Sequence, residues 1–444
     1  MRGIRRGTGR GLRLTAKLLL RLARRALLLA LRAARPLTTA RRPEAGEPGR
    51  LRVRILLLHA YGMGGTTRAV LNLAGQLATA HDVEIISLRR NRDKPFFPFP
   101  AGVKVTALDD HIAPRGWACR LLSRLPSVLT PVEDASFRWL SLWSDLRLAA
   151  RLATLRCDVL IGTRPSLNLL VADAAPRGVL TIGQDHMNLG SYRRELRAAI
   201  VRRYRRLDVV AVLTATSLAD YSAALAGAPV KVVKIPNSLP ALPGGPATGE
   251  GRVVLAAGRL IPQKGFDMLI EAFSLVAAKH PDWTLRIFGS GSQRDELLKM
   301  IAERGLGHQI DLRGRTTDLA GELSKASVYA LSSRHEGLPM VLIEAMSKGL
   351  APVAFDCPTG PAEMITHRRN GILVPAEDVA AFAAALDEVL GDDELRRDLA
   401  AGATAAARAY DPAVIGASWN NLLAAHRPHL TQPTPPSGRP QPGR

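Results

Sequence analysis

The chain has 444 residues, an apolar share of 47% and a formal net charge of +22. This length and composition predict a globular protein with two domains. Cys119, Cys157 and Cys357 lie far apart and form no CxxC or Cys/His cluster, which excludes a disulfide framework or a zinc site of the usual spacing and favours a reducing compartment.

Much of the positive charge lies at the N-terminus, because residues 1–50 hold 14 lysines or arginines and only two glutamates. Residues 15–35 are mostly leucine and alanine with basic residues at helical spacing, which predicts a cationic amphipathic helix. We expect this helix to bind an anionic membrane surface, and a disordered basic leader is the alternative. Nucleic acid is not an expected partner, because aromatic residues for base stacking are absent from this region.

The apolar run 26–31 is too short to span a bilayer and lacks a small-residue cleavage site. We therefore expect a cytoplasmic protein that associates peripherally with the inner face of the cell membrane.

Short apolar runs alternate with helical patterns through residues 51–237. The run 53–58 predicts a buried strand, and Gly62, Gly64, Gly65 and a helix over 69–77 follow it. Further strands are expected at 83–88, 103–108, 159–162, 209–213 and 230–235, with a long helix over 137–155. This alternation predicts a parallel sheet, and residues 51–237 form the first expected domain.

A second alternating series follows residues 238–251, whose prolines and glycines predict a linker. Strands are expected at 253–257, 285–288, 310–312, 328–331 and 351–355, with a helix beginning at Phe266. The predicted fold class is therefore α/β, with two Rossmann-like domains facing one another across a cleft and a basic N-terminal helix. The second domain spans 252–410, a helix at 411–427 is expected to return to the first domain, and the proline-rich tail 428–444 is expected to be disordered.

Charged residues occupy the loops that follow strands of the second domain, where open parallel sheets bind ligands. Arg259 and Lys264 share one loop, and their charges suit a diphosphate. Glu336 and Glu344 stand eight positions apart across a loop-to-helix junction, about 10 Å at the rise of a helix. That distance is too long for a shared proton or metal and suits the two ends of one polyhydroxyl ligand.

Backbone amides are the other candidate ligand-binding groups. Those of Gly337 and Leu338 lie at a predicted helix N-terminus, which favours an anion. Gly64 and Gly65 would let a ligand approach the backbone, although a tight turn without ligand contact is an equal alternative. Gly289 follows a predicted strand in the same way and joins the ligand-binding set.

Together these segments resemble one family over roughly residues 52–425. Gly258-Arg259-Leu260, Lys264-Gly265-Phe266-Asp267, Glu336-Gly337-Leu338-Pro339 and Glu344-Ala345-Met346 resemble the donor half of the retaining GT-B glycosyltransferases of family 4. The resemblance implies that Arg259 and Lys264 bind the donor diphosphate, Glu344 the ribose and Glu336 the transferred sugar. His186 matches a loop histidine that faces the reacting sugar in this family.

The resemblance also implies how the reaction proceeds. Catalysis would rest on Glu336, His186, Lys264 and Arg259 through positioning and charge stabilisation, with neither metal nor cofactor. Asp109-Asp110, the paired-aspartate candidate in the N-terminal half, is interpreted as a solvated strand end.

The expected function is a retaining hexosyltransferase that uses a nucleotide diphosphate sugar, UDP-linked, and acts on a cell-envelope glycolipid, polysaccharide or polyol phosphate. Residues 356–361 resemble the subset acting on cell-surface polymers or polyol phosphates. A nucleotide-sugar epimerase or hydrolase and a non-catalytic membrane adaptor are the alternatives.

Overall fold

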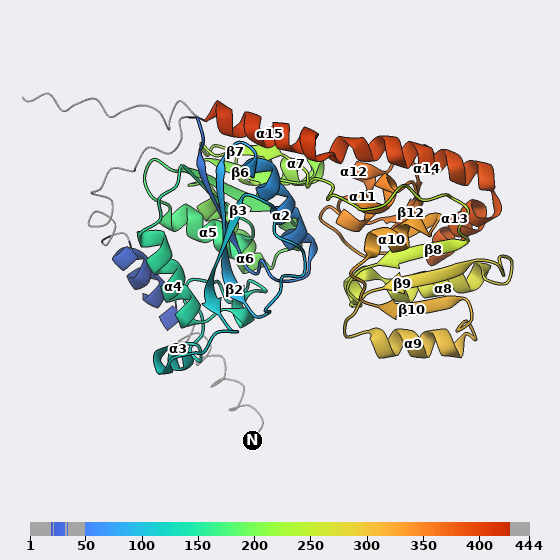
Figure 1. The fold of residues 1–444 in the computed structure, drawn as a ribbon, viewed down its shortest axis with the longest axis horizontal. Helices are drawn as coiled ribbons and strands as arrows, with labels where there is room; N and C mark the ends of the chain where they lie inside the picture. The colour runs from blue at the N-terminus through green and yellow to red at the C-terminus, as the bar shows by residue number, and fades with distance from the viewer. Residues whose placement is uncertain (1–18, 21, 32, 34–48, 427–444) are drawn as a thin grey trace, which may run out of the picture.

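The computed structural model describes residues 19–20, 22–31, 33 and 49–426, which form two α/β domains side by side (Figure 1). Each domain contains one parallel sheet with helices on both faces, so the predicted fold class is confirmed. The expected proline-rich tail and most of the basic leader lie outside the described residues.

The N-terminal domain contains a seven-stranded parallel sheet in the order β3-β2-β1-β4-β5-β6-β7. Its strands are β1 (Arg52–Leu57), β2 (Asp82–Arg90), β3 (Val103–Asp110), β4 (Val159–Gly162), β5 (Leu180–Asp185), β6 (Val209–Val212) and β7 (Lys231–Lys234). The central strands are buried along their whole length, as expected for a parallel sheet that helices cover on both faces. The sequence predicted six of these strands and missed β5.

The helices of this domain are α2 (Gly65–Ala78), α3 (Trp117–Leu122), α4 (Leu142–Ala153), α5 (Pro165–Ala174), α6 (Arg194–Tyr204) and α7 (Ala215–Ala224), with 3-10 turns η1 (Phe137–Trp139) and η2 (Leu189–Ser191). The single helix expected over 137–155 is two elements, because Ser141 forms a capping box with Ser144 and starts α4 there.

The described residues between 19 and 33 are helical and pack against the N-terminal domain. Leu28 and Leu31 are buried in its core, and Arg24 donates to Asp173 of α5 at 3.1 Å. Leu22 and Leu29 remain exposed. The leucines that the sequence assigned to a membrane are thus divided between a protein core and solvent.

The C-terminal domain contains a six-stranded parallel sheet in the order β10-β9-β8-β11-β12-β13. Its strands are β8 (Val253–Ala257), β9 (Thr284–Phe288), β10 (Ile310–Gly314), β11 (Val328–Leu331), β12 (Ala351–Asp356) and β13 (Ile372–Pro375). Its helices are α8 (Phe266–Val276), α9 (Arg294–Glu303), α10 (Leu319–Ser324), α11 (Met340–Ser347), α12 (Pro361–Met364), α13 (Val379–Gly391) and α14 (Asp393–Ala407), with 3-10 turns η3 (Pro262–Lys264) and η4 (Arg408–Tyr410).

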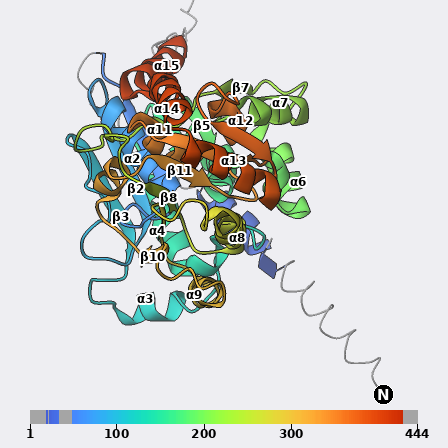
Figure 2. The same cartoon turned by 90° about the vertical axis from the view of Figure 1, so that its right-hand side faces the viewer.

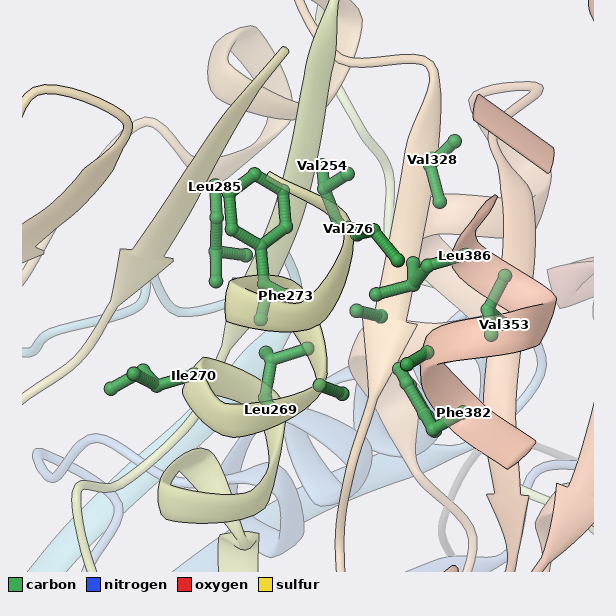
Figure 3. Close-up of a cluster of buried hydrophobic side chains, with 14 of the residues drawn as sticks. Val254, Leu269, Ile270, Phe273, Val276, Leu285, Val328, Val353, Phe382 and Leu386 are labelled. Atoms are coloured by element: carbon green, nitrogen blue, oxygen red, sulfur yellow. The ribbon is translucent and has the colours of Figure 1, made fainter. Parts of the chain in front are cut away.

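The core of this domain lies between the sheet and helices α8 and α13, which lie side by side (Figure 3). Leu269 and Phe273 of α8 face Val254 and Leu285 of the sheet, and all four side chains are fully buried. This core holds the ends of β8 and β11, and therefore the loops that follow them, in fixed positions.

The chain crosses between the domains twice. No helix or strand occurs between β7 and β8, and α15 (Pro412–Ala425) returns from the C-terminal domain to pack against α2 (Figure 1). Trp419 of α15 is 1% exposed in the core of the N-terminal domain. The two crossings touch, because the Leu239 amide donates to the Tyr410 carbonyl at 2.7 Å.

Among the described residues, no helix has the length and apolar content needed to cross a bilayer.

Replacing Phe273 by alanine should lower the free energy of unfolding by about 3–5 kcal/mol, because it leaves a cavity in a closed core. Urea denaturation followed by circular dichroism measures this change. Leu275→Ala, at a position 59% exposed on the same helix, is the control and should change stability by less than about 0.5 kcal/mol. Equal losses in the two variants would contradict the assignment of the core.

Candidate functional site at the domain junction

The two domains touch where the loops after their central strands meet. A Cβ atom on Gly337, in the loop after β11, would lie 2.2 Å from the carbonyl oxygen of His186, in the loop after β5. Only glycine permits this approach, because any side chain would push the two loops apart. Gly65, at the start of α2, lies near Met340 of α11 across the same junction.

Glu336 and Lys264 form an ion pair at this junction. The Lys264 ammonium lies 2.5 Å from Oε1 of Glu336, and the Ser333 hydroxyl donates to the same oxygen at 2.6 Å. Glu336 is 6% exposed, so its charge depends on these donors. The loop after β8 and the loop after β11 thus place a cation and an acid together.

Arg259 lies in the same loop as Lys264 but extends into solvent. Its side chain has no ion pair or hydrogen bond with any described residue, so its guanidinium is available to an anionic ligand. Nearby, Gly289 allows the backbone to pass close to the β8 loop, since a Cβ atom there would lie 1.8 Å from the Gly258 carbonyl oxygen. Gly289 therefore allows the loop after β9 to pack against the loop after β8.

The amides that precede α11 are unpaired. Within the part of the chain that the structure describes, neither Gly337 nor Leu338 donates a backbone hydrogen bond, while the Glu336 amide donates to Pro358. These two donors follow Glu336 and lie at the N-terminal end of α11, where anions bind favourably. Gly64 and Gly65 supply further amides at the N-terminus of α2.

Glu344 lies on the second turn of α11 and is 1% exposed. Its charged partner comes from the other domain, because Arg68 of α2 lies 3.1 Å from Oε1 of Glu344. Burial raises the pKa of Glu344 to about 7, and the Arg68 charge opposes that rise. A ligand that binds Glu344 must therefore share the carboxylate with Arg68 or displace it.

His186 follows β5 and presents two unused nitrogens. Both ring nitrogens are shielded from solvent and have no hydrogen-bond partner in the described chain. Burial, with a contribution from the Arg164 charge, lowers the pKa of His186 to about 4. The imidazole is therefore neutral near pH 7 and can both donate and accept a hydrogen bond.

Asp185, the residue before His186, fixes the end of β5. Three phenols donate to its carboxylate, from Tyr192, Tyr204 and Tyr221. Burial raises the pKa of Asp185 to about 6, and the three hydroxyls oppose this rise. The loop that carries His186 is thus held by hydrogen bonds from three separate segments.

The sequence predictions placed the acidic and basic residues of the C-terminal domain, and the structure brings Lys264, Glu336, Gly337 and Leu338 together. Arg68 and Asp185 were missed. A signal for Arg68 exists, because a cation in the first turn of a helix is unfavourable to the helix dipole unless an acid lies close. Asp185 had no comparable signal, since its tyrosines lie up to 36 residues away.

The interpretation of Asp109-Asp110 as a solvated strand end is wrong for Asp109. Its side chain is 3% exposed and pairs with Arg115 at 2.7 Å and with His111 at 2.9 Å.

Throughout residues 19–20, 22–31, 33 and 49–426, no group of three or more His, Cys, Asp or Glu side chains is placed to hold a metal ion.

Two family models match consecutive parts of the chain. Residues 244–406 match the family model described as "Glycosyl transferases group 1", and residues 63–239 match "Glycosyltransferase Family 4". The chain is 34% identical over 385 residues to an exopolysaccharide phosphotransferase of Streptomyces coelicolor, covering 84% of this chain and 40% of that protein. The chain thus spans less than half the length of that relative.

A second relative and a solved structure agree with these matches. The poly(ribitol-phosphate) alpha-N-acetylglucosaminyltransferase of Staphylococcus aureus is 30% identical over 173 residues, 39% of this chain and 35% of that protein. The crystal structure of S. aureus TarM with fondaparinux, alpha-GlcNAc-glycerol and UDP has a TM-score of 0.67 at 15% identity, covering 84% of this chain and 99% of that one. At this identity the likeness concerns the fold.

Glu344 should make stability depend on pH. Its folded pKa of about 7 lies above the ordinary value of 4.5, so the folded protein holds an extra proton between these limits and loses stability as pH rises through them. Glu344→Gln should therefore gain stability relative to wild type between pH 5 and pH 8, on the order of 1–3 kcal/mol.

Chemical denaturation at the two pH values measures this difference. Glu303→Gln, at an exposed position on α9, is the control and should follow wild type at both. A Glu344→Gln difference that does not change with pH would rule out the raised pKa.

Proposed function

The chain belongs to the group 1 glycosyl transferases of family 4, which have the GT-B fold, and we propose that it transfers a sugar from a UDP-linked donor to a cell-envelope polymer with retention of configuration. The observation that carries this proposal is the cluster formed by Lys264, Glu336, Glu344 and the two unpaired amides of Gly337 and Leu338.

The donor would bind along the start of α11. Its diphosphate would take the unpaired amides and the charges of Arg259 and Lys264, since both residue types bind phosphoryl oxygens. Its ribose hydroxyls would bind Glu344, and the hydroxyls of the transferred sugar would bind Glu336. Over residues 336–344 the order Glu336, the two amides and Glu344 matches the order sugar, diphosphate and ribose in such a donor.

The reaction would depend on charge stabilisation. As the bond between sugar and phosphate breaks, negative charge grows on the leaving diphosphate, where Arg259, Lys264 and the amides can stabilise it. Glu336, held by Lys264 and Ser333, would orient the sugar. Neutral His186, with both nitrogens unused, would hold a sugar hydroxyl from the opposite domain.

The acceptor would be a polysaccharide or a polyol phosphate with repeated hydroxyls. The S. aureus relative is named for transfer to poly(ribitol phosphate), and the S. coelicolor relative for an exopolysaccharide. The latter is named as a phosphotransferase, and this activity would leave a phosphoryl group on the product. Mass spectrometry of products formed with UDP-sugars and polyol-phosphate acceptors distinguishes the two reactions.

Lys264→Ala and Glu336→Gln should each lower kcat by at least about a hundredfold, because each removes a group that stabilises or orients the reacting centre. Transfer of radiolabelled sugar measures kcat, and circular dichroism checks the fold. Lys279→Ala is the control, since Lys279 is 66% exposed and pairs with Asp387 of α13, and neither residue belongs to the loops of the site. Turnover at the wild-type rate in both site variants would overturn the assignment.

Peripheral membrane association is the second part of the proposal. The N-terminal helix exposes Leu22 and Leu29, and α3 lies on the same side of the domain (Figure 1). On α3, Trp117 is 79% exposed and Leu121 54% exposed. Exposed aromatic and leucine side chains beside arginines are typical of surfaces that insert into the interface of an anionic bilayer.

The double substitution Leu22→Gln and Leu29→Gln should reduce flotation with vesicles of phosphatidylglycerol and phosphatidylcholine severalfold, because it removes exposed apolar area without touching buried Leu28 and Leu31. The control pair is Leu275→Gln and Leu298→Gln in the C-terminal domain, at positions 59% and 41% exposed. If all three proteins float equally, the N-terminal helix has no part in membrane binding.

A further inference from the structure

Helix α6 forms one wall of a basic groove on the N-terminal domain. The groove has a volume of about 730 Å³ and runs along the helix. Its charged lining consists of Arg194, Arg197, Arg202 and Arg205. Its floor is made of small and apolar side chains, among them Ala198 and Val201 of α6 and Ala224 of α7.

These four arginines are exposed and have no acidic partner at ion-pair distance among the described residues. Two neighbours on α6 and just after it behave differently, because Arg203 and Arg206 both pair with buried Asp173. The nearest acids along the chain are Glu195, which is exposed, and Asp208, which accepts hydrogen bonds from Thr181. Neither forms an ion pair with a described residue. The positive charge of the groove is therefore not neutralised by the protein itself.

The cost of this arrangement argues for a ligand. Like charges three or four positions apart on a helix destabilise it, and Arg194 with Arg197 and Arg202 with Arg205 have this spacing. The helix dipole offsets part of this repulsion for Arg202 in the last turn and Arg205 at the C-cap, but it does not act on Arg194 and Arg197 at the N-terminal end. An anion in the groove would remove the repulsion.

The groove begins beside the candidate site. Leu189, which lines it, follows His186 by three residues, and α6 begins after that loop at the carboxyl end of β5. The helix then runs back along the sheet, and α6 and α7 lie at the side of the molecule in Figure 2. From Arg194 to Arg205 the helix rises about 16 Å, so the groove leads away from His186 over several repeats of a linear polymer.

We propose that this groove binds a linear chain of phosphodiester units, and that this chain is the acceptor. The proposal rests on the proposed function, since it requires a polymer whose hydroxyl reaches His186 while its following phosphates lie along α6. Arginine forks suit phosphate oxygens, and the small apolar floor suits a backbone without bulky bases.

Two other polyanionic surfaces fit less well. A bilayer would require large exposed apolar side chains along the groove, and none occurs between residues 189 and 224. The exposed Leu22 and Leu29 lie on the neighbouring N-terminal helix, whose Arg24 shares Asp173 with Arg203, and not in the groove lining. Single-stranded nucleic acid would require exposed aromatic rings for stacking, but Tyr204 and Tyr221 are fully buried and donate to Asp185. A phosphodiester polymer of small polyols needs neither feature.

The test uses the full chain with Arg194, Arg197, Arg202 and Arg205 changed to Gln. The probe is a fluorescein-labelled oligomer of eight ribitol phosphate units, and anisotropy gives the Kd at several salt concentrations. The variant should bind at least tenfold more weakly, and the slope of log K against log salt should fall by roughly 2 to 3, since four phosphate contacts are lost.

The matched control changes Arg156, Arg177, Arg369 and Arg408 to Gln, because these arginines are equally exposed and lie outside the groove. It alters the net charge by the same amount and should bind the oligomer like wild type. If both quadruple variants bind the oligomer equally weakly, the groove is not the binding site and the loss reflects only the change in net charge.

Further measurements separate this proposal from the proposed function. The groove variant should bind UDP like wild type and should transfer sugar to a single ribitol phosphate at the wild-type kcat, while its KM for the polymer rises at least tenfold. Glu336→Gln should still bind the oligomer. Phosphatidylglycerol vesicles and single-stranded DNA are tested in the same way. If either binds the wild type more tightly than the oligomer does, and the groove variant loses that binding, the groove has another partner and the assignment is overturned.

Discussion

A buried carboxylate requires a positive partner, and in this protein the partner of Glu344 comes from the other domain. The ion pair with Arg68 joins residues 276 positions apart and lies within the candidate site. Because Glu344 is almost completely shielded, moving Arg68 away leaves a charge that only protonation or a ligand can compensate. The separation of the domains and the occupancy of the site are thus coupled through one carboxylate.

The two domains contribute different kinds of chemistry. The C-terminal domain holds the clustered cations, acids and free amides, in the loops that follow the adjacent strands β8 and β11 and in the first turns of α11. The N-terminal domain contributes a neutral imidazole, the cation that Glu344 needs and the arginines of α6. A ligand with a strongly charged centre and a long anionic extension matches this division, since the centre would meet one domain and the extension the other.

Sequence patterns located the C-terminal domain well, because its strands are short apolar runs that end at glycines or polar loops. The bounds of β8 and β11 agree with the prediction residue for residue. Strand β5 was missed because Thr181, Gly183 and Gln184 interrupt its apolar pattern, although the whole strand is buried. The periodicity of the N-terminal helix could not show whether its leucines pack on lipid or protein, and Leu28 and Leu31 in fact pack on protein. Contacts between the domains, such as Arg68 with Glu344, follow only from the tertiary arrangement.

The chain passes between the domains at two places, and the Leu239 to Tyr410 hydrogen bond joins these passages. A single flexible connection would let one domain swing and twist freely about the other. Two connections that touch restrict this relative motion more than one connection would. The approach of the β5 loop to the β11 loop, at His186 and Gly337, is therefore kept by these two crossings together with the Arg68–Glu344 ion pair.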